Sequence, residues 1–176
     1  MPRLIPESYS GMAESEPHIR VDLARQELAL WQGASLLGRY PVSTARNGPG
    51  ESLGSGCTPL GRHRIRLRIG ADCPENTVFV GRRPTGEIYN PGLSARYPER
   101  DWILTRILWL TGMESSRNRG GRVDTLRRYI YIHGCPDAEP MGTPRSHGCI
   151  RMRNQDLLRL FDRVCNGTPV EILEIG

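Results

Sequence analysis

The sequence predicts a β-rich single domain with one main α-helix near its C-terminus, and three observations support this. Several short segments alternate apolar and polar residues, as half-buried strands do. The chain contains 20 glycines and 14 prolines, which favour many turns and therefore many short strands. Only one segment, close to the C-terminus, repeats apolar residues at helical spacing.

The 176 residues fit one domain, which we expect to span residues 18–176 behind a flexible arm at residues 1–17. The hydrophobic fraction of 38% is too high for a disordered chain. No apolar run approaches the roughly 18 residues that a membrane span needs, and the N-terminus lacks the apolar stretch of a secretory signal. We therefore expect a cytoplasmic protein, or a periplasmic one if the chain lacks a native leader.

Basic residues outnumber acidic ones by 24 to 19, and every basic residue is Arg, so the net charge is +5. Such a charge can favour nucleic acid binding. However, the arginines are spread along the chain and mixed with acids, so we expect no nucleic acid partner. The five cysteines are an odd number, which fits free thiols in a reducing compartment better than a disulfide framework.

Residues 18–45 contain three runs of alternating apolar and polar side chains, separated by turns. The first run places Ile19, Val21 and Leu23 at every second position. This period is typical of strands with one buried face. We therefore predict an antiparallel meander of three strands.

A glycine-rich loop, NGPGESLGSG, follows at residues 47–56. A phosphate-binding loop would need a Lys-Ser or Lys-Thr ending and a helix behind it, and the sequence shows neither. We interpret this segment as a mobile connection.

Residues 61–69 show the strictest alternation in the chain. One side of this predicted strand carries His63, Ile65, Leu67 and Ile69, and the other carries Arg62, Arg64, Arg66 and Arg68. We interpret the arginines as a solvated face, with a wall that binds the carboxylates of an acidic substrate as the alternative. We expect the apolar-side histidine to be a core residue rather than a ligand.

Two further strands are predicted in the middle of the chain. The first covers residues 76–80, and the second is the apolar run 102–110, whose aromatic and β-branched residues favour a strand over a helix. The turn-rich segment 82–100 between them is expected to be irregular. The polar, glycine-rich segment 112–124 is expected to form a flap.

The C-terminal part combines a strand at residues 129–132, the main helix and a last strand at residues 168–175. Asn154 is a plausible N-cap of the helix, and Gly167 is a natural terminator. The apolar residues at helical spacing are Leu157, Leu158, Phe161 and Val164.

The tripeptide His-Gly-Cys occurs twice, at residues 133–135 and 147–149. A thiol and an imidazole brought together by a folded loop are the parts of a cysteine nucleophile with its base. We predict Cys149 as the nucleophile and His133, at the end of a strand, as the base.

The neighbours of Cys149 fit this chemistry. A predicted helix begins just beyond it and three arginines lie within four residues, and both features would favour the thiolate if the side chains converge. These arginines are Arg145, Arg151 and Arg153. Gly148 removes bulk beside the nucleophile, so backbone N–H groups could approach a developing oxyanion. We expect Ser146 to hydrogen-bond within its loop and His147 to have a structural role in the cleft.

A zinc site is the alternative interpretation of the two tripeptides, since His133, Cys135, His147 and Cys149 are ligand types that zinc prefers. The one-residue spacers are shorter than those of zinc motifs, and a core of this size needs no metal. We therefore expect no metal and no cofactor. Our hypothesis for Cys135 is that it pairs with Cys149 under oxidant and switches the enzyme off.

The HG pair at residues 133–134 and the heptapeptide SHGCIRM at residues 146–152 together resemble the signature of the YkuD-type L,D-transpeptidase catalytic domain. The similarity covers about residues 18–175, including YPVSTA at 40–45 and TPLGRHRI at 58–65. The resemblance implies a β-sandwich of mixed sheets, with the cysteine at the base of a cleft under a flap.

The resemblance also implies the reaction. Cys149 would attack the carbonyl of the third residue of a peptidoglycan stem peptide, commonly diaminopimelate, expel the terminal D-alanine and form a thioester. His133 would be the base, and the backbone of Gly134 would orient its imidazole.

The resemblance assigns supporting roles around this pair. The amides of His147, Gly148 and Cys149 would form the oxyanion hole. Arg151 would hold the motif or bind the substrate carboxylate, and Ser146 is a second substrate-binding candidate.

The signature combined with the missing leader makes a cytosolic L,D-carboxypeptidase that acts on recycled muropeptides our first expectation. The alternative is an L,D-transpeptidase that forms cross-links or exchanges D-amino acids, and a remote one is a zinc-stapled muropeptide-binding module. Carbapenems are expected to acylate Cys149 and so to act as covalent inhibitors.

Overall fold

The structure is a computed structural model, and it describes residues 16–176. The predicted arm at residues 1–17 therefore lies outside the described residues except for its last two positions. The elements, in chain order, are β1 (Pro17–Asp22), β2 (Glu27–Gln32), β3 (Ser35–Ser43), β4 (Gly61–Ile69), β5 (Thr77–Val80), β6 (Arg83–Ile88), α1 (Pro91–Arg96), β7 (Ile103–Gly112), the 3-10 helix η2 (Gly121–Val123), β8 (Tyr131–Gly134), β9 (Ile150–Met152), α2 (Asn154–Phe161) and β10 (Pro169–Leu173).

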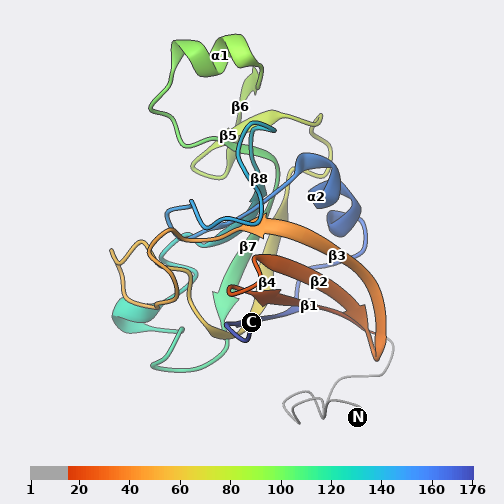
Figure 1. Cartoon of the computed structure of the whole chain (residues 1–176), viewed down its shortest axis with the longest axis vertical. Coiled ribbons are helices and arrows are strands. Elements are labelled where there is room, and N and C mark those ends of the chain that lie inside the picture. Colours follow the sequence, from red (N-terminus) through yellow and green to blue (C-terminus); the bar gives the residue numbers. More distant parts are fainter. Residues whose placement is uncertain (1–15) are drawn as a thin grey trace.

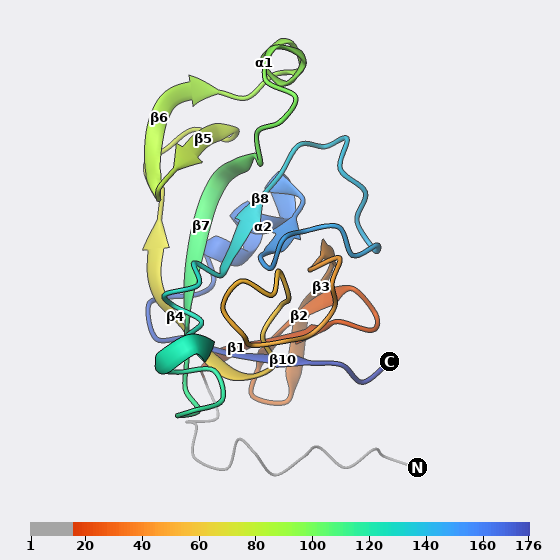
Figure 2. The ribbon, with the colours of Figure 1, turned by 90° about the vertical axis from the view of Figure 1, so that its left-hand side faces the viewer.

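The strands form one hydrogen-bonded sheet that closes on itself. Their order is β4-β10-β1-β2-β3-β9-β8-β7, and β7 pairs back with β4. Beyond this ring, β5 and β6 extend from β7 and form one end of the molecule together with α1 (Figures 1 and 2). The pairs β1–β10 and β8–β9 are parallel and the others are antiparallel. The prediction of a mainly β fold with mixed strand pairing is confirmed.

The predicted meander is formed by β1, β2 and β3, which pair in antiparallel fashion. The Oδ1 atom of Asp22 closes the first turn by accepting the N–H of Ala24 at 3.0 Å. The second turn contains Gly33 at φ +56°, a backbone conformation that glycine adopts without steric cost. Local turn chemistry therefore sets the register of this part of the sheet.

The main core lies inside the ring of strands. Its members are apolar side chains from both halves of the ring together with one face of α2, and burying each contributes about 1.5–3 kcal/mol. The fully buried strand residues include Ile19, Leu28, Leu30, Ile65, Leu108, Leu110, Ile132, Ile150 and Met152. The helix contributes Leu157, Leu160 and Phe161 and packs against β7 and β8.

The start of α2 differs from the prediction. Its N-cap is Arg153, without a capping side chain, and Asn154 is already helical and buried. The Asn154 Oδ1 atom accepts a hydrogen bond from Thr105 Oγ1 at 2.7 Å, and its Nδ2 donates to Cys135 O at 3.0 Å. This side chain is turned inward and ties the end of β8 to β7 and α2. Likewise, Gly167 does not terminate the helix, which already ends at Phe161.

The alternation of β4 is confirmed only in its first half. His63 and Ile65 are buried, but Leu67 is 37% exposed because the register with β7 shifts between Ile65 and Leu67. Arg62, Arg64 and Arg66 are exposed, as expected of a solvated face. Arg68 instead lies over the ring of Phe161 at 3.9 Å and donates to the carbonyl of that residue.

His63 is the core histidine that the sequence predicts. Its Nδ1 atom lies 3.0 Å from Gly61 O and its Nε2 atom 3.0 Å from Thr125 Oγ1. Burial lowers its pKa to about 4. The Gly61 carbonyl and Glu114 raise the pKa, but their effect is smaller than that of burial. The folded protein therefore holds this imidazole neutral.

We expect His63 to make the protein sensitive to acid. Between pH 6.5 and about 4 the unfolded chain binds a proton at this site that the folded protein excludes, so stability falls as pH falls through this window. Between pH 7 and pH 5, His63 should lower the free energy of unfolding by about 2 kcal/mol. Urea unfolding at both pH values should show a smaller acid-induced loss for His63→Gln than for the parent. Equal losses would contradict the assignment.

Two segments predicted as irregular or loose are ordered. Residues 82–100 contain β6 and α1, and Asn90 caps α1 by accepting the N–H of Leu93. In the predicted flap 112–124, the buried Asn118 donates to the carbonyls of Leu60 and Arg62 at 3.1 Å each. These bonds fasten the segment to the start of β4.

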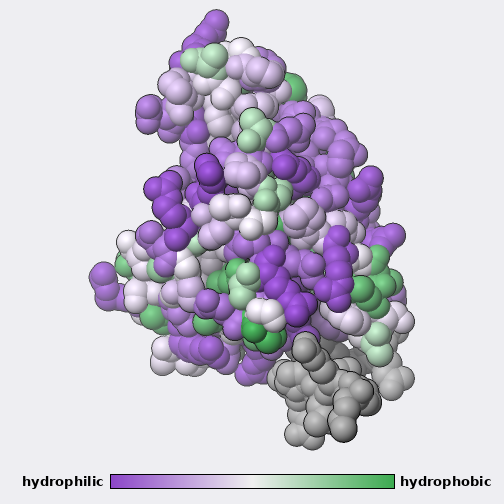
Figure 3. All heavy atoms as spheres, viewed as in Figure 1, coloured by the Kyte–Doolittle hydropathy of each residue, from purple (hydrophilic) through white to green (hydrophobic). Residues whose placement is uncertain are grey.

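The face of the molecule seen in Figure 3 is mostly hydrophilic, with hydrophobic residues in small separate groups. In the described part of the chain, no helix has the length and apolar character needed to cross a membrane.

Candidate active site

The Cys149 sulfur lies at the end of the loop that leads into β9. The loop passes beside Tyr129 and Tyr131, because β9 pairs in parallel with β8. The thiol donates to Tyr129 O at 3.3 Å, and the N–H of Tyr131 donates to the sulfur at 3.3 Å. These two backbone bonds hold the sulfur in place. The residue as a whole is only partly buried.

His133 lies on β8 and is almost fully buried. Its Nδ1 atom is 2.6 Å from the carbonyl of Gly134, which only accepts, so the ring hydrogen is on Nδ1 and Nε2 is the acceptor. Burial lowers the pKa of His133, while the Gly134 carbonyl and Asp101 raise it and Arg151 lowers it further. The imidazole is therefore neutral at neutral pH.

The strand register places the segments that carry the thiol and the imidazole side by side. His133 lies directly opposite Arg151 in the parallel pair β8–β9. Cys149 precedes Arg151 by two residues and lies just before β9, level with Tyr131. Cys149 and His133 therefore lie two positions apart across the β8–β9 pair, although 15 residues separate them in the sequence.

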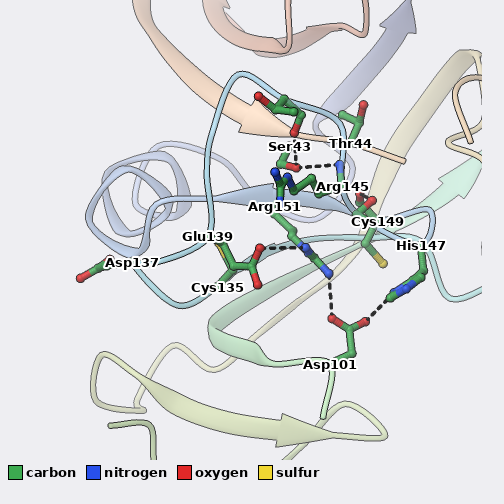
Figure 4. A network of polar contacts seen from close by, with 12 residues as sticks. Ser43, Thr44, Asp101, Cys135, Asp137, Glu139, Arg145, His147, Cys149 and Arg151 are labelled. Carbon is green, nitrogen blue, oxygen red and sulfur yellow. Dashed lines mark hydrogen bonds and ion pairs between the residues drawn. The ribbon is translucent and has the colours of Figure 1, made fainter. Parts of the chain in front are cut away.

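Asp101 is a site residue that the sequence does not reveal. Its carboxylate lies 3.0 Å from Arg151 Nη2 and 3.6 Å from His147 Nδ1, and Figure 4 shows it bridging the two. Burial alone would raise its pKa, but the charges of His133, Arg151 and His147 outweigh burial and lower it. The segment before β7 carries no motif that would mark this residue, and only the fold places it there.

The structure contradicts the expected low pKa of the nucleophile. Burial raises the pKa of the Cys149 thiol to about 12, although Tyr131 N–H, Arg151 and Arg128 act in the opposite direction. The predicted arginines do not converge on the sulfur. Arg151 pairs with Asp101 and Glu139, and Arg153 donates to two backbone carbonyls. The resting nucleophile is thus a neutral thiol that needs a base.

Arg151 therefore holds the motif, the first of its two predicted roles. Its side chain is only 9% exposed, and both of its carboxylate partners belong to the protein (Figure 4). A guanidinium paired twice inside the protein has little capacity left for a substrate carboxylate.

Ser146 is buried and makes both of its hydrogen bonds inside the loop. Its hydroxyl donates to Cys149 O at 2.5 Å and accepts the N–H of Gly148 at 3.2 Å. The substrate-binding prediction for Ser146 is therefore wrong, and its expected role within the loop is confirmed. His147, in contrast, is largely exposed, with a side-chain exposure of 72%.

Gly148 occupies a crowded position with φ +136°. A Cβ atom there would come within 3.2 Å of both Cys57 O and Ile130 Cδ1. Its carbonyl accepts the Thr58 hydroxyl at 2.8 Å, so the loop is fixed against the segment after the glycine-rich connection. Within residues 16–176, the N–H of Gly148 is bonded to Ser146, whereas that of Cys149 has no protein acceptor.

The glycine-rich connection 47–56 is fixed rather than mobile. Arg128 donates to Gly50 O at 3.2 Å and to Cys57 O at 2.7 Å. Asn47 Nδ2 also donates to Ser55 O within the connection. Arg128, which no sequence motif marks, thus ties this connection to the segment that leads into β8.

Gly134 is required by close packing around the base. A Cβ atom would overlap Asn154 Oδ1 and come within 2.6 Å of Leu104 O. We expect Gly134→Ala to destabilise the fold by about 1–3 kcal/mol, the usual cost of overpacking. It should also lower activity, because it displaces the carbonyl that orients His133. Thermal unfolding measures the first effect, and an unchanged midpoint would contradict this packing.

The two thiols of the proposed redox pair are far apart, which contradicts that hypothesis. Gly134 lies opposite Met152 and Ile132 opposite Ile150, so Cys149 is level with Tyr131. Cys135 is four residues further along, about 13 Å at strand spacing. A disulfide needs Cα atoms within about 7 Å. Cys135 is instead buried with its sulfur 3.5 Å from Met152 O, and Figure 4 shows it apart from Cys149.

The residues of the zinc hypothesis do not converge either. His133 and Cys135 are buried, whereas His147 is exposed and faces Asp101. In the described part of the chain, no group of three or more His, Cys, Asp and Glu side chains is arranged to hold a metal ion.

A charged pocket of about 300 Å³ adjoins this site. Four arginines and three carboxylates, among them Arg151 and Asp101, line it together with His147. Charged walls keep such a pocket hydrated, which suits a polar peptide better than an apolar ligand.

Comparison with known proteins agrees with this geometry. The model of the L,D-transpeptidase catalytic domain, YkuD, matches residues 16–172. The chain belongs to this family. The probable L,D-transpeptidase ErfK/SrfK of Salmonella typhimurium is 28% identical over 173 residues, which are 97% of this chain and 51% of that relative. The chain spans about half or less of the length of the curated relatives that it matches.

Solved structures of the family share its fold. An L,D-transpeptidase from Xylanimonas cellulosilytica aligns with a TM-score of 0.58 at 18% identity, covering 91% of this chain and 61% of the other. L,D-transpeptidase 3 from Mycobacterium tuberculosis, in complex with a faropenem-derived adduct, aligns at 0.55 with 18% identity and covers 90% and 61%. The predicted YkuD-like fold is therefore confirmed.

Proposed function

We propose that the protein is a cysteine acyl-enzyme peptidase that acts on peptidoglycan stem peptides. It would cleave the bond before the terminal D-alanine of a tetrapeptide. The observation that carries this proposal is the register of β8 and β9, which puts the segments of Cys149 and His133 side by side, together with a neutral imidazole whose Nε2 is the acceptor. The family membership supports the same substrate class.

In the proposed mechanism, His133 takes the proton of the Cys149 thiol as the sulfur attacks the carbonyl of the third residue. Asp101 stabilises the imidazolium that forms, because its charge raises the pKa of His133. We assign the oxyanion to the N–H of Cys149, since that of Gly148 is already bonded to Ser146. The imidazolium then protonates the departing D-alanine amine, which leaves a thioester on Cys149.

We propose water as the acceptor of the acyl group, which makes the protein an L,D-carboxypeptidase. The pocket lined by Asp101, His147 and Arg151 supports this choice, because charged walls favour water inside it. The five cysteines are all unpaired, which fits muropeptide recycling in a reducing compartment. The alternative is an L,D-transpeptidase, which Glu99, Asp101 and Glu139 in the pocket wall favour because carboxylates attract an amine acceptor.

Mass spectrometry of a tetrapeptide stem incubated with the protein tests both alternatives. Hydrolysis predicts tripeptide and free D-alanine as the only products, whereas transfer predicts cross-linked dimers or exchanged D-amino acids. An intact tetrapeptide would refute both.

A carbapenem provides a second test of the nucleophile. Since solved family members are in complex with imipenem and with a faropenem-derived adduct, we expect a carbapenem to acylate Cys149 and to raise the protein mass by one adduct. A peptide map should place the adduct on Cys149, and an adduct on another cysteine would contradict the mechanism.

A further inference from the structure

An arginine is presented beside the nucleophile by the β5–β6 hairpin. The hairpin turn consists of Gly81 and Arg82, whose φ angles are +55° and +64°. This two-residue turn matches the twist of the strands, but it places a non-glycine residue in the left-handed region, where few side chains are found. Such positions occur often at functional sites.

Three aromatic side chains hold the Arg82 guanidinium. Its carbon lies 4.7 Å from the ring centre of Trp109 and 4.8 Å from that of Tyr129. Its Nη1 atom donates to the Tyr131 hydroxyl at 3.1 Å, and this bond raises the pKa of Arg82. The cation is therefore fixed in position, unlike a free surface arginine.

Within residues 16–176, Arg82 forms no ion pair with a carboxylate, whereas Arg100 and Arg151 in the pocket wall do. A guanidinium has five N–H donors, and the Tyr131 hydroxyl occupies one of them. The remaining donors can bind a carboxylate in the two-pronged geometry that arginine favours.

The same two tyrosines also hold the nucleophile. The thiol of Cys149 donates to Tyr129 O and accepts from Tyr131 N. The cation thus stands one tyrosine side chain away from the reacting sulfur. One peptide residue spans about 3.5 Å, so the residue next to a scissile carbonyl at Cys149 can extend from the sulfur toward this cation.

We propose that Arg82 binds the free C-terminal carboxylate of the leaving residue, one residue beyond the attacked carbonyl. Resting on the proposed function, this assignment adds its specificity: the site accepts a peptide that ends directly after the scissile bond and discriminates against one whose terminal carboxylate is blocked. Trp109, Tyr129 and Tyr131 are positioning residues for the cation.

Two substrates test the proposal, a tetrapeptide with a free C-terminus and the same peptide as a C-terminal amide. The parent protein should prefer the free acid, and Arg82→Gln should lower kcat/KM for it about 10–100-fold, as expected for a lost charged hydrogen bond. The rate for the amide should stay within about twofold, so the preference should disappear. The adjacent exposed Arg83→Gln is the matched control and should leave both rates unchanged.

The outcomes separate the two claims. If the parent cleaves neither substrate, the proposed function fails. If it cleaves the free acid but Arg82→Gln lowers both rates equally, or neither, then the function stands and the carboxylate assignment is overturned. Equal thermal unfolding midpoints of parent and variant should accompany the expected result.

Discussion

Replacing Cys149 with alanine is expected to lower the release of D-alanine from a tetrapeptide by about 10⁴-fold or more, the scale seen when a catalytic nucleophile is removed. The hydrogen bonds of its sulfur involve only the backbone of Tyr129 and Tyr131. The fold should therefore tolerate the change. The variant should also gain no mass when it is incubated with a carbapenem.

Cys135→Ala is the matched control for this experiment. Cys135 is the other cysteine of the repeated tripeptide, but its sulfur is buried against Met152 O and lies far from Cys149. We expect the control to keep most of the activity and the carbapenem adduct. Full activity in Cys149→Ala, or loss of the adduct only in Cys135→Ala, would refute the assignment of the nucleophile.

Replacing His133 with glutamine is expected to lower kcat/KM by about 10²–10⁴-fold, the range that general base catalysis supplies. The loss should be large here because burial raises the pKa of the Cys149 thiol to about 12, so few thiolates form without a base. Because His133 is buried, the thermal unfolding of the variant must be measured as well. Near-normal turnover by a folded variant would exclude His133 as the base.

The pH profile of the parent protein reports on the same imidazole. A base is active when it is unprotonated, and burial lowers the pKa of His133 below 6.5. Activity should therefore stay level through neutral pH and fall only below pH 6.5. In Asp101→Asn, the carboxylate that raises the pKa of His133 is gone, so this acidic limb should move to still lower pH. A limb that moves upward would contradict the placement of Asp101.

Several features of the fold follow from local patterns. The meander of β1 to β3, the strand β7 and the apolar face of α2 were predictable because burial on one face imposes a period of two on strands and of 3.6 on helices. The patterns failed where other forces decide. The bulge after Ile65 turned Leu67 outward, and β6 and α1 formed in a segment whose turn residues hide their periodicity.

Some expectations failed because they required distances that a sequence does not contain. The three arginines near Cys149 in the chain suggested a thiolate, yet Arg151 and Arg153 bind elsewhere and burial controls the pKa of the thiol. Cys135 is close to His133 along the chain, but the register of β8 and β9 places it well beyond Cys149.

The sequence by itself determined the chemistry: a thiol and an imidazole in a recognisable spacing, on a mainly β scaffold. The tertiary structure alone decided the electrostatics and the specificity, because Asp101, Arg128 and Arg82 come from separate segments with no motif of their own. Charge interactions depend on distance and burial in space rather than along the chain. The residues that tune the nucleophile could therefore be identified only after the strands had closed around it.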